Sequence, residues 1–305
     1  MSGDSEVFVV GSVNADLVVE VPRRPGPGET VSGTDLATLP GGKGANQAVA
    51  ASRLGGRVVM LGRVGRDSAG EVVAAALLRA GVDTADVEAL ADVPTGVALI
   101  TLTPDGENSI VVSPGANGRL APGDVDAVRE RLARAAVLTL QLEIPMETVV
   151  RAVAVGAEVG PRIVLNLAPP RRPPDAVLRD LDPLVVNEHE AAALLGAVSP
   201  GSGEEVARRL CDLGPRSAVV TLGAAGAAFA GSGASGVVRA PRVSVVDTTG
   251  AGDAFVGALS LALARGHDLE AACRYGVGAG TWAVQGKGAQ TSFPDADQLE
   301  IPEVR

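Results

Sequence analysis

The residues best suited to chemistry lie in the stretch DTTGAGD, residues 247–253. Gly250, Ala251 and Gly252 have almost no side chain, so their backbone N–H groups can approach a ligand closely, and a helix start there favours an anion. A carboxylate such as Asp253 repels a bound phosphate unless the reaction needs it. A general base that takes a proton from an attacking hydroxyl group meets that need, so the stretch predicts phosphoryl transfer. The alternative is an ordinary helix start, where Asp and Gly are common.

The flanking elements must position this stretch. Residues 243–246 are apolar and predict a short strand, and residues 254–264 are rich in Ala and Leu at helical spacing. We therefore expect a strand, a tight turn and a helix around residues 247–253.

Elsewhere in the chain, apolar strands alternate with helical runs. The pattern predicts strands at 7–10, 58–61, 137–140, 163–165, 184–186 and 218–222, and helices at 43–54, 69–80, 145–155 and 188–195. This alternation is typical of an α/β fold with a central, mostly parallel sheet flanked by helices on both faces. We expect one domain over residues 1–305.

A few segments interrupt the alternation. Residues 17–21 and 29–39 are short and broken by prolines, which indicates exposed strands outside the main sheet. Residues 96–103 and 109–113 flank a turn at 104–107 and predict a hairpin. Together these segments, at about 14–40 and 94–114, predict a small β-sheet lid over the site.

Polar side chains follow several of the predicted strands. Asn14 and Asp16 follow the strand at 7–10, and Glu143 follows the strand at 137–140. An amide and a carboxylate at the carboxyl end of a strand can bind the vicinal hydroxyl groups of a sugar, although an Asx turn also explains Asn14 and Asp16. The strand at 7–10 runs into Gly11, but the other glycines of a dinucleotide-binding fingerprint are missing, which rejects an NAD-dependent oxidoreductase.

A glycine-rich sequence, PGGKGANQA at residues 40–48, opens the helix predicted at 43–54. It is not a Walker-type phosphate loop, because Gly44 follows Lys43 where a Ser or Thr is required. What remains is a turn that lets the backbone approach a small ligand, with Lys43 and Asn46 as polar groups facing it. A plain loop with a solvated lysine is the alternative.

Two further clusters suit a nucleotide. Asn187 and Glu190 share a helix N-terminus after the strand at 184–186, where oxygen ligands and water hold Mg²⁺ well. The sequence TLGAAG, residues 221–226, is a second turn from a strand into glycines. Each cluster alone has a structural alternative, a cap or a turn, but their shared position after strands favours a ligand site.

Composition limits the partners and the compartment. The formal net charge of −10 argues against nucleic acid and against an anionic membrane. Cys211 and Cys273 form no disulfide framework, and the first residues are polar and acidic, unlike a signal peptide, so we expect a cytoplasmic protein. The apolar run at 254–264 is too short to cross a bilayer.

Taken together, the motifs resemble those of a known family. The sequences GSVNAD (11–16), GGKGANQA (41–48), NEHE (187–190), DTTGAGD (247–253) and KGAQ (287–290) occur in the same order in the ribokinase-like carbohydrate kinases. The chain resembles that family over nearly its full length. The resemblance implies ATP-dependent phosphorylation of D-ribose at O5 to give D-ribose 5-phosphate.

The resemblance also implies roles for individual residues. Asp253 is implied as the catalytic base, and the backbone of Gly250, Ala251 and Gly252 as the group that stabilises charge on the γ-phosphoryl group. The implied sugar-binding residues, beside Asp253, are Asn14, Asp16, Gly42, Lys43, Asn46 and Glu143. The implied ATP-binding residues are Asn187, Thr221, Gly223, Gly226 and Gly252. Glu190 is implied to act on Mg²⁺ through water. The implied ligands of a monovalent activator, K⁺, are Asp247, Thr249, Ala283, Gly286, Gly288 and Ser292. The resemblance further implies a homodimer formed through the lid.

Two positions bear on specificity. Val277 stands where relatives commonly place Asn or His against adenine, so an apolar contact with the base is implied. An amide at Asn14 favours a sugar that retains its 2-hydroxyl group, since similar deoxyribose kinases are apolar at this position. The alternatives are a kinase for another sugar, such as 2-deoxyribose, a ketose or a nucleoside, and a non-catalytic sugar-binding regulator on the same fold.

Overall fold

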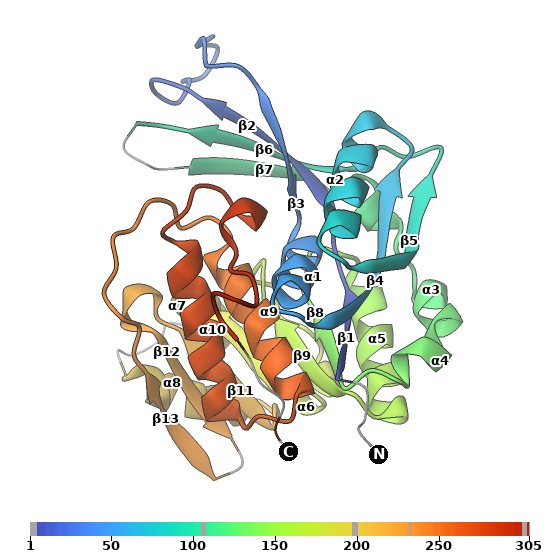
Figure 1. Ribbon diagram of the computed structural model, residues 1–305, viewed down its shortest axis with the longest axis vertical. Helices are drawn as coiled ribbons and strands as arrows, with labels where there is room; N and C mark the ends of the chain where they lie inside the picture. The colour runs from blue at the N-terminus through green and yellow to red at the C-terminus, as the bar shows by residue number, and fades with distance from the viewer. Residues whose placement is uncertain (1–4, 105–107, 197–200, 232, 301–303, 305) are drawn as a thin grey trace.

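Short apolar segments form a nine-stranded sheet at the centre of the structure, a computed structural model that describes residues 5–104, 108–196, 201–231, 233–300 and 304 (Figure 1). The strand order is β13-β12-β11-β10-β9-β8-β1-β4-β5, and the pairs from β11 through β5 are parallel. The antiparallel strands β12 and β13 extend one edge. The bounds are β1 (Glu6–Val10), β4 (Arg57–Gly65), β5 (Asp83–Leu90), β8 (Val137–Leu140), β9 (Arg162–Asn166), β10 (Leu184–Asn187), β11 (Ser217–Thr221), β12 (Ala227–Gly231) and β13 (Ala234–Val238).

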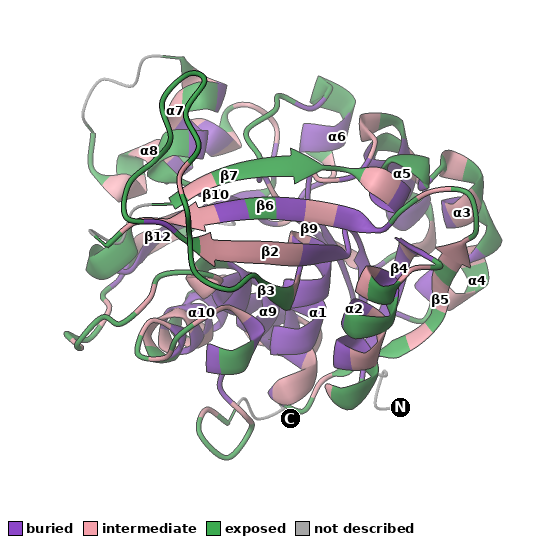
Figure 2. Ribbon diagram, turned by 90° about the horizontal axis from the view of Figure 1, so that it is seen from above, coloured by how far each residue is buried: buried purple, intermediate pink, exposed green. Residues whose placement is uncertain are grey.

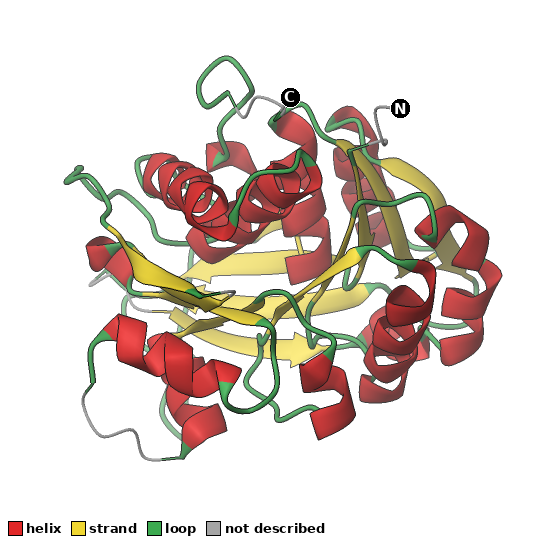
Figure 3. Cartoon of the chain, turned by 90° about the horizontal axis from the view of Figure 1, so that it is seen from below, coloured by secondary structure: helices red, strands yellow, loops and turns green. Residues whose placement is uncertain are grey.

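Helices cover both faces of this sheet (Figure 3), as the sequence predicts. One face carries α1 (Lys43–Arg53), α2 (Ser68–Arg79), α9 (Ala251–Ala264) and α10 (Leu269–Ala283). The other face carries α3 (Pro122–Ala127), α4 (Arg129–Leu132), α5 (Met146–Val159), α6 (Asp175–Arg179), α7 (Glu188–Leu195) and α8 (Gly203–Cys211). Short 3₁₀ helices occur at η1 (Gly115–Arg119), η2 (Gly223–Ala225) and η3 (Gln290–Ser292). None of the helices in the described ranges combines the length and the apolar character that a membrane span requires.

Most residues of the central strands β1, β4, β8, β9, β10 and β11 are buried, which explains their apolar sequences. In β1, Val7 and Val9 belong to the core beneath α1, α9 and α10, whereas Phe8 and Val10 belong to the core on the opposite face. The same alternation continues in the neighbouring strands, because successive side chains of a strand point to opposite faces. Because the central strands are parallel, their carboxyl ends lie along the same side of the sheet. The predicted site residues begin there.

A second, four-stranded sheet stands apart from the first (Figure 1). Its strands, in order, are β3 (Ala37–Gly41), β2 (Asn14–Glu20), β6 (Gly96–Leu102) and β7 (Asn108–Ser113). The predicted hairpin is confirmed, since β6 and β7 pair antiparallel; its tip, residues 105–107, lies outside the described residues. The edge strand β7 is largely exposed (Figure 2).

Two strand predictions are wrong. Residues 243–246 form no strand: Val245 and Val246 are 59% and 63% exposed, and the N–H of Val246 donates to the carbonyl oxygen of Val284 at the end of α10 (2.8 Å). This segment is a surface connection between β13 and α9, so its apolar side chains bury no sheet face. Residues 29–36 also form no strand. Here a local turn competes, in which the carboxylate of Glu29 accepts from the N–H of Gly26 (3.0 Å) and pairs with Arg23.

Candidate active site

Helix α9 begins at the glycine turn that the sequence singles out. Gly250 precedes the helix with φ of 76°, and a Cβ there would lie 2.7 Å from the Cβ of Ala289, so only glycine fits. Gly252 differs, because a Cβ at that position would meet no atom within 4 Å. The first turn of α9 therefore packs against the chain on one side and leaves open space for a ligand on the other.

The carboxylate of Asp253 lies in this first turn and is 8% exposed. Its Oδ2 accepts from Nδ2 of Asn46 (2.9 Å), and its Oδ1 accepts from Nε2 of Gln47 (3.0 Å). Both donors come from α1, which packs closely on α9: a Cβ on Gly257 would lie 2.6 Å from the Cβ of Ala50. The close contact between α1 and α9 therefore keeps both donors in place on the carboxylate of Asp253.

Charge in the site is balanced between several carboxylates and one lysine. Burial raises the pKa of Asp253 above its ordinary value, while the charge of Lys43 and the hydrogen bonds from Asn46 and Gln47 lower it. Burial lowers the pKa of Lys43, but the surrounding carboxylates, Asp253 first, raise it above its ordinary value overall. Lys43 therefore remains charged and offsets part of the negative charge around Asp253.

The residues predicted to bind sugar gather on the side of the small sheet. Burial, then repulsion from Glu143 and Asp253, raises the pKa of Asp16 to about 7. Oε2 of Glu143 accepts from the Ser12 hydroxyl group (2.6 Å) and from the N–H of Lys43 (3.1 Å). These contacts hold a second carboxylate close to Asp16 and beside the start of α1.

Glycines let this part of the backbone close tightly. Gly42, the residue before α1, has φ of 88°, and a Cβ there would lie 2.7 Å from the backbone nitrogen of Asn14. Asn14 itself is buried at the start of β2, and its Oδ1 accepts from Nδ2 of Asn117 (2.7 Å). The structure therefore brings together Asn14, Asp16, Gly42, Lys43, Asn46, Glu143 and Asp253, all of the predicted sugar-binding set.

A small pocket of about 140 Å³ joins Asp253 to the predicted nucleotide residues. Its lining includes Lys43, Asn187, Glu190, Thr221, Gly250 and Gly252. Asn187 and Glu190 also form a capping box, in which Asn187 Oδ1 accepts from the Glu190 N–H (2.7 Å) and Glu190 accepts from the Asn187 N–H (2.8 Å). Gly223 and Gly226, with φ of 54° and 104°, form the tight turn after β11.

The donor set fits Mg²⁺ held through a nucleotide. Within the described residues, no group of at least three His, Cys, Asp or Glu side chains could hold a metal ion. Mg²⁺ commonly uses one or two carboxylates together with substrate phosphates and water, and Glu190 lines the same pocket as Asp253. Burial raises the pKa of Glu190, which the N–H of Asn187 partly offsets.

The predicted K⁺ ligands lie around the turn before α9. Oδ1 of Asp247 accepts from the N–H of Thr249 (2.9 Å), and Oδ2 accepts from the N–H of Gly288 (2.8 Å). The N–H of Gly286 donates to the Ala283 carbonyl oxygen (3.2 Å), and a Cβ on Gly286 would lie 2.8 Å from the Cβ of Ser292. Burial raises the pKa of Asp247, but the hydrogen bonds from Thr249 and Gly288 lower it overall, so this carboxylate is held in its ionised form beside the other predicted ligands.

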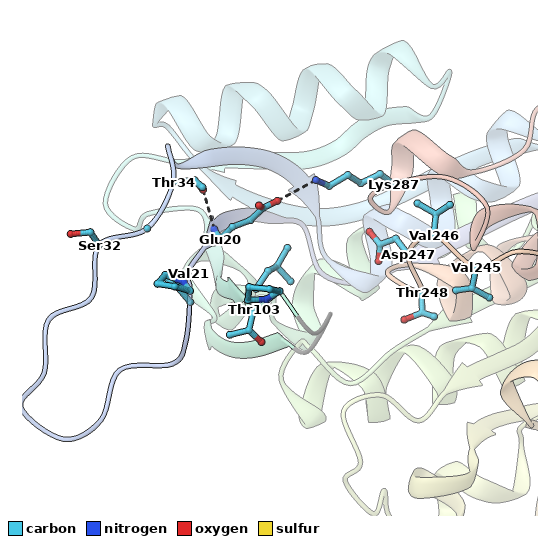
Figure 4. Close-up of a pocket in the computed structure, with 14 residues that line it drawn as sticks. Glu20, Val21, Ser32, Thr34, Thr103, Val245, Val246, Asp247, Thr248 and Lys287 are labelled. Carbon is cyan, nitrogen blue, oxygen red and sulfur yellow. Dashed lines mark hydrogen bonds and ion pairs between the residues drawn. The ribbon is translucent and has the colours of Figure 1, made fainter.

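A larger pocket of about 870 Å³ opens beside these residues (Figure 4). Its lining comes from the tip of the small sheet and from residues 245–248, and Lys287 Nζ spans it to reach Glu20 Oε1 at 3.2 Å. Asp253 does not line it, so the smaller pocket is the candidate site for chemistry. Val277 is 6% exposed within the core on α10 and offers little surface to a nucleotide base.

Several residues that hold the site are not in the predicted set. They are Ser12, which donates to Glu143; Gln47, which donates to Asp253; Asn117, which donates to Asn14; and Gln290, whose Nε2 donates to Asn46 Oδ1 (3.0 Å). Gln47 and Gln290 stand inside the motifs GGKGANQA and KGAQ, so the motifs contain a signal for them. Asn117 has no comparable signal, because only the fold brings it to Asn14.

Comparison with known proteins agrees with this geometry. The family described as pfkB family carbohydrate kinase matches residues 4–296. A ribokinase of Schizosaccharomyces pombe is 40% identical over 306 residues, which covers 96% of each chain. A deoxyribokinase of Salmonella typhi is 36% identical over 297 residues and covers 96% of this chain and 97% of its own. The structure of Arabidopsis thaliana ribokinase complexed with ribose and ATP is 34% identical, with a TM-score of 0.87 and 96% of each chain covered.

The matched range contains both glycine-rich helix starts and the polar residues that follow the strands of the main sheet. The similarity therefore extends to the elements that hold Asp253, and not only to the sheet. This agreement confirms the resemblance drawn from the motifs: the chain belongs to the pfkB family of carbohydrate kinases.

Proposed function

We propose that this protein transfers the γ-phosphoryl group of ATP to O5 of D-ribose. One observation carries the proposal: the buried carboxylate of Asp253 is fixed by Asn46 and Gln47 at the glycine start of α9, in a pocket that also contains Asn187 and Glu190. A base beside an anion site and beside sugar-binding groups is the arrangement that phosphorylation of an alcohol needs.

The reaction follows from the positions of these groups. Asp253 takes the proton of the ribose 5-hydroxyl group as its oxygen forms a bond to the γ-phosphorus, and the bond from that phosphorus to the β,γ-bridging oxygen breaks. ADP leaves with the released electron pair, and Asp253 keeps the proton until the products depart. The backbone N–H groups of Gly250, Ala251 and Gly252 would donate to the γ-phosphoryl oxygens, where negative charge is concentrated, and the Ala251 N–H would exchange its bond to the Thr248 carbonyl oxygen (3.3 Å) for this one. Glu190 would act through water on Mg²⁺, which would neutralise phosphate charge.

The orientation of Asn14 supports a sugar with a 2-hydroxyl group. The backbone N–H of Val13 donates to Oδ1 of Asn117 (2.8 Å), which leaves the Asn117 Nδ2 to donate to Oδ1 of Asn14. Asn14 must then present its own Nδ2 as a donor, and this group makes no hydrogen bond within the described part of the chain. A hydroxyl group of the sugar can accept that bond. The deoxyribokinase relative makes 2-deoxyribose the nearest rival substrate.

Further features belong to the same proposal. The residues around Asp247 would hold K⁺, the small sheet would act as a lid and as the contact of a homodimer, and residues 1–305 would form one kinase domain. Both cysteines are free thiols in the structure, which is compatible with the reducing cytoplasm that we propose as its compartment.

Replacement of the base tests the function. We expect Asp253→Asn to lower kcat by at least ~10²-fold, because a positioned base contributes about 10²–10⁴-fold, while ribose still binds. The measurement is ADP release together with ribose binding by calorimetry. Near-normal turnover in this variant would reject the mechanism.

A panel of sugars tests the substrate. With the unaltered protein, ADP release should be fastest with ribose, and weaker with 2-deoxyribose, ketoses and nucleosides. Faster turnover of another sugar would replace ribose in the proposal. Sugar binding without any ADP release would favour a non-catalytic binding protein.

A further inference from the structure

A chain of buried amide groups leads away from Asp253. Gln47 is 1% exposed, and its Nε2 donates to Oδ1 of Asp253 (3.0 Å) and to Oδ1 of Asn166 (3.1 Å). Its Oε1 accepts from Nε2 of Gln141 (2.7 Å), which is fully buried after β8. Gln47 is too deeply enclosed to contact the sugar, so any effect on the reaction must pass through Asp253.

The direction of every bond in this chain follows from the carboxylate. An ionised carboxylate only accepts hydrogen bonds, so Gln47 must turn its Nε2 toward Asp253 and its Oε1 toward Gln141. Gln141 must then donate, and its own Oε1 is left buried without a hydrogen-bond partner. A Cβ on Gly11 would lie 2.0 Å from this oxygen, so glycine makes the room for it.

A buried acceptor without a hydrogen-bond partner, such as Oε1 of Gln141, destabilises the fold. A core that served stability alone would place an apolar side chain there, because replacing both partners of a buried hydrogen bond by apolar groups can be neutral. The chain of amides therefore serves the group at its other end, the carboxylate of Asp253.

We propose that Gln47 is a positioning residue for phosphoryl transfer, which holds the Asp253 carboxylate in the orientation and the ionised form that the sugar hydroxyl group requires. The inference rests on the proposed function of Asp253 as the base. Asn46 supports the other carboxylate oxygen, but it is part of the predicted sugar site, whereas Gln47 is hydrogen-bonded to no predicted sugar-binding residue other than Asp253. Each oxygen of the carboxylate keeps further lone-pair capacity for the substrate.

The charged groups around Asp253 set the direction of the effect. Those that face it are Lys43 from α1, Asp16 from β2, Glu143 from the segment after β8 and Glu190 from α7. Burial and the carboxylates oppose ionisation, and Lys43, Asn46 and Gln47 favour it. Removal of the Gln47 donor should therefore leave Asp253 protonated, and inactive as a base, over a wider range of acidic pH.

The test is the pH dependence of kcat and of the KM for ribose in Gln47→Met, which has a similar volume and no donor. We expect the acid limb of kcat to move upward by about one pH unit, since hydrogen bonds to charged groups contribute that much. Turnover should fall by about tenfold on the acid side, recover to within about threefold of the unaltered protein at high pH, and leave KM within about twofold. A purely structural defect would lower kcat equally at every pH.

Two further variants sharpen the result. Gln47→Glu keeps the shape and adds a like charge beside Asp253, so its acid limb should move further than that of Gln47→Met. It carries the test if Gln47→Met does not fold, as judged by circular dichroism. Gln141→Met makes the same amide-to-thioether change at the residue that contacts Gln47 and not Asp253. The acid limb of its kcat profile should move by less than about a third of the shift in Gln47→Met.

The outcomes separate the inference from the function beneath it. If Asp253→Asn is inactive but Gln47→Met and Gln47→Glu keep the original acid limb, the inference is overturned and the base remains. A large rise in the KM for ribose with an unmoved limb would also overturn it, because Gln47 would then shape the sugar site. If Asp253→Asn retains turnover, the proposed function fails first, whatever the Gln47 variants show.

Discussion

At the scale of single residues, the site collects charges that a stable core avoids. Asp16, Glu143, Glu190 and Asp253 surround one cation, Lys43, and burial opposes the ionised form of three of these carboxylates. Such clusters are costly to a folded chain and are characteristic of functional sites. The amide donors around Asp253 partly offset this cost.

The raised pKa of Asp16 makes the free energy of unfolding depend on pH. Its pKa of about 7 lies above the ~3.9 of an unfolded chain, so between these values the folded state binds more protons. Its contribution to the free energy of unfolding is fully present below the lower value and is lost as the pH rises to about 7. We therefore compare the free energy of unfolding of Asp16→Asn with that of the unaltered protein. From pH 4 to pH 8 the difference should shift by more than ~1 kcal/mol in favour of the variant.

Urea denaturation at both pH values measures this difference. Asp35→Asn, on the exposed loop before β3, is the matched control and should show no such trend. An equal stability difference at the two pH values for Asp16→Asn would contradict the raised pKa.

At the scale of elements, two helix starts do the positioning. The first turns of α1 and α9 both follow a glycine with positive φ, and the two helices pack through Gly257 and Ala50. At the start of α1 these N–H groups are already bonded, since those of Lys43 and Gly44 donate to Glu143 and to the Ser12 hydroxyl group. The N–H groups at the start of α9 are the ones that we propose for the ligand. The close packing of α1 and α9 fixes these donors and Asp253 relative to one another.

Two neighbouring glycines separate the roles of fold and ligand at α9. Gly250→Ala should destabilise the protein by at least about 1–2 kcal/mol, because φ is positive and Ala289 blocks the Cβ. Gly252→Ala should leave stability unchanged or raise it by up to ~1 kcal/mol, since the position is helical and the Cβ meets no atom. It should still lower kcat by at least ~10-fold, because that methyl group enters the space proposed for the phosphoryl group.

Thermal unfolding and ADP release distinguish the two variants. A stable, fully active Gly252→Ala protein would show that no phosphoryl group approaches this turn. A stable Gly250→Ala protein would contradict the packing against Ala289.

The loop around Asp247 yields a prediction about ions. Turnover should rise about fivefold or more when K⁺ replaces tetramethylammonium at constant ionic strength, because an ordered turn before α9 favours the active arrangement. Asp247→Ala should remove this response, since Asp247 holds both Thr249 and Gly288. Equal rates in the two salts with the unaltered protein would reject the K⁺ site.

At the scale of the whole molecule, the site lies where the small sheet meets the edge of the large one. Asp16 comes from the small sheet, while Asp253 and Glu190 come from helices on the two faces of the large sheet (Figure 1). The small sheet also exposes apolar side chains that neither sheet covers. They are Leu39, Leu99, Ile110, Val111 and Val112. This exposure supports the proposed homodimer contact.

Charges placed on β7 test that contact. Ile110 and Val111 are 52% and 65% exposed, and as neighbours in a strand they point to opposite faces of the small sheet. The double variant Ile110→Lys/Val111→Lys should convert a dimer to a monomer in light scattering. Val237→Lys, on β13 at the edge of the large sheet, should leave the mass unchanged. A monomeric unaltered protein would contradict the dimer.

The sequence by itself determined the class of fold and the identity of the chemical groups. Strand periods, helix starts and glycine turns depend on neighbouring residues, so the parallel sheet, α1, α9 and the hairpin of β6 and β7 could be predicted. Local patterns failed where packing decides. Residues 243–246 have the sequence of a strand, but the Val284 carbonyl oxygen at the end of α10 accepts the N–H of Val246 instead.

Only the tertiary structure decided how these groups act together. Asn46 and Asp253 are 207 positions apart, and Asn117 and Asn14 are 103 apart, so no local signal shows that they share hydrogen bonds. The raised pKa of Asp16 and the direction of the amide chain through Gln47 likewise depend on which charges and donors the fold places beside them. Local backbone preference sets where a reactive side chain stands along the chain, but its protonation and orientation are set by neighbours that only folding brings near.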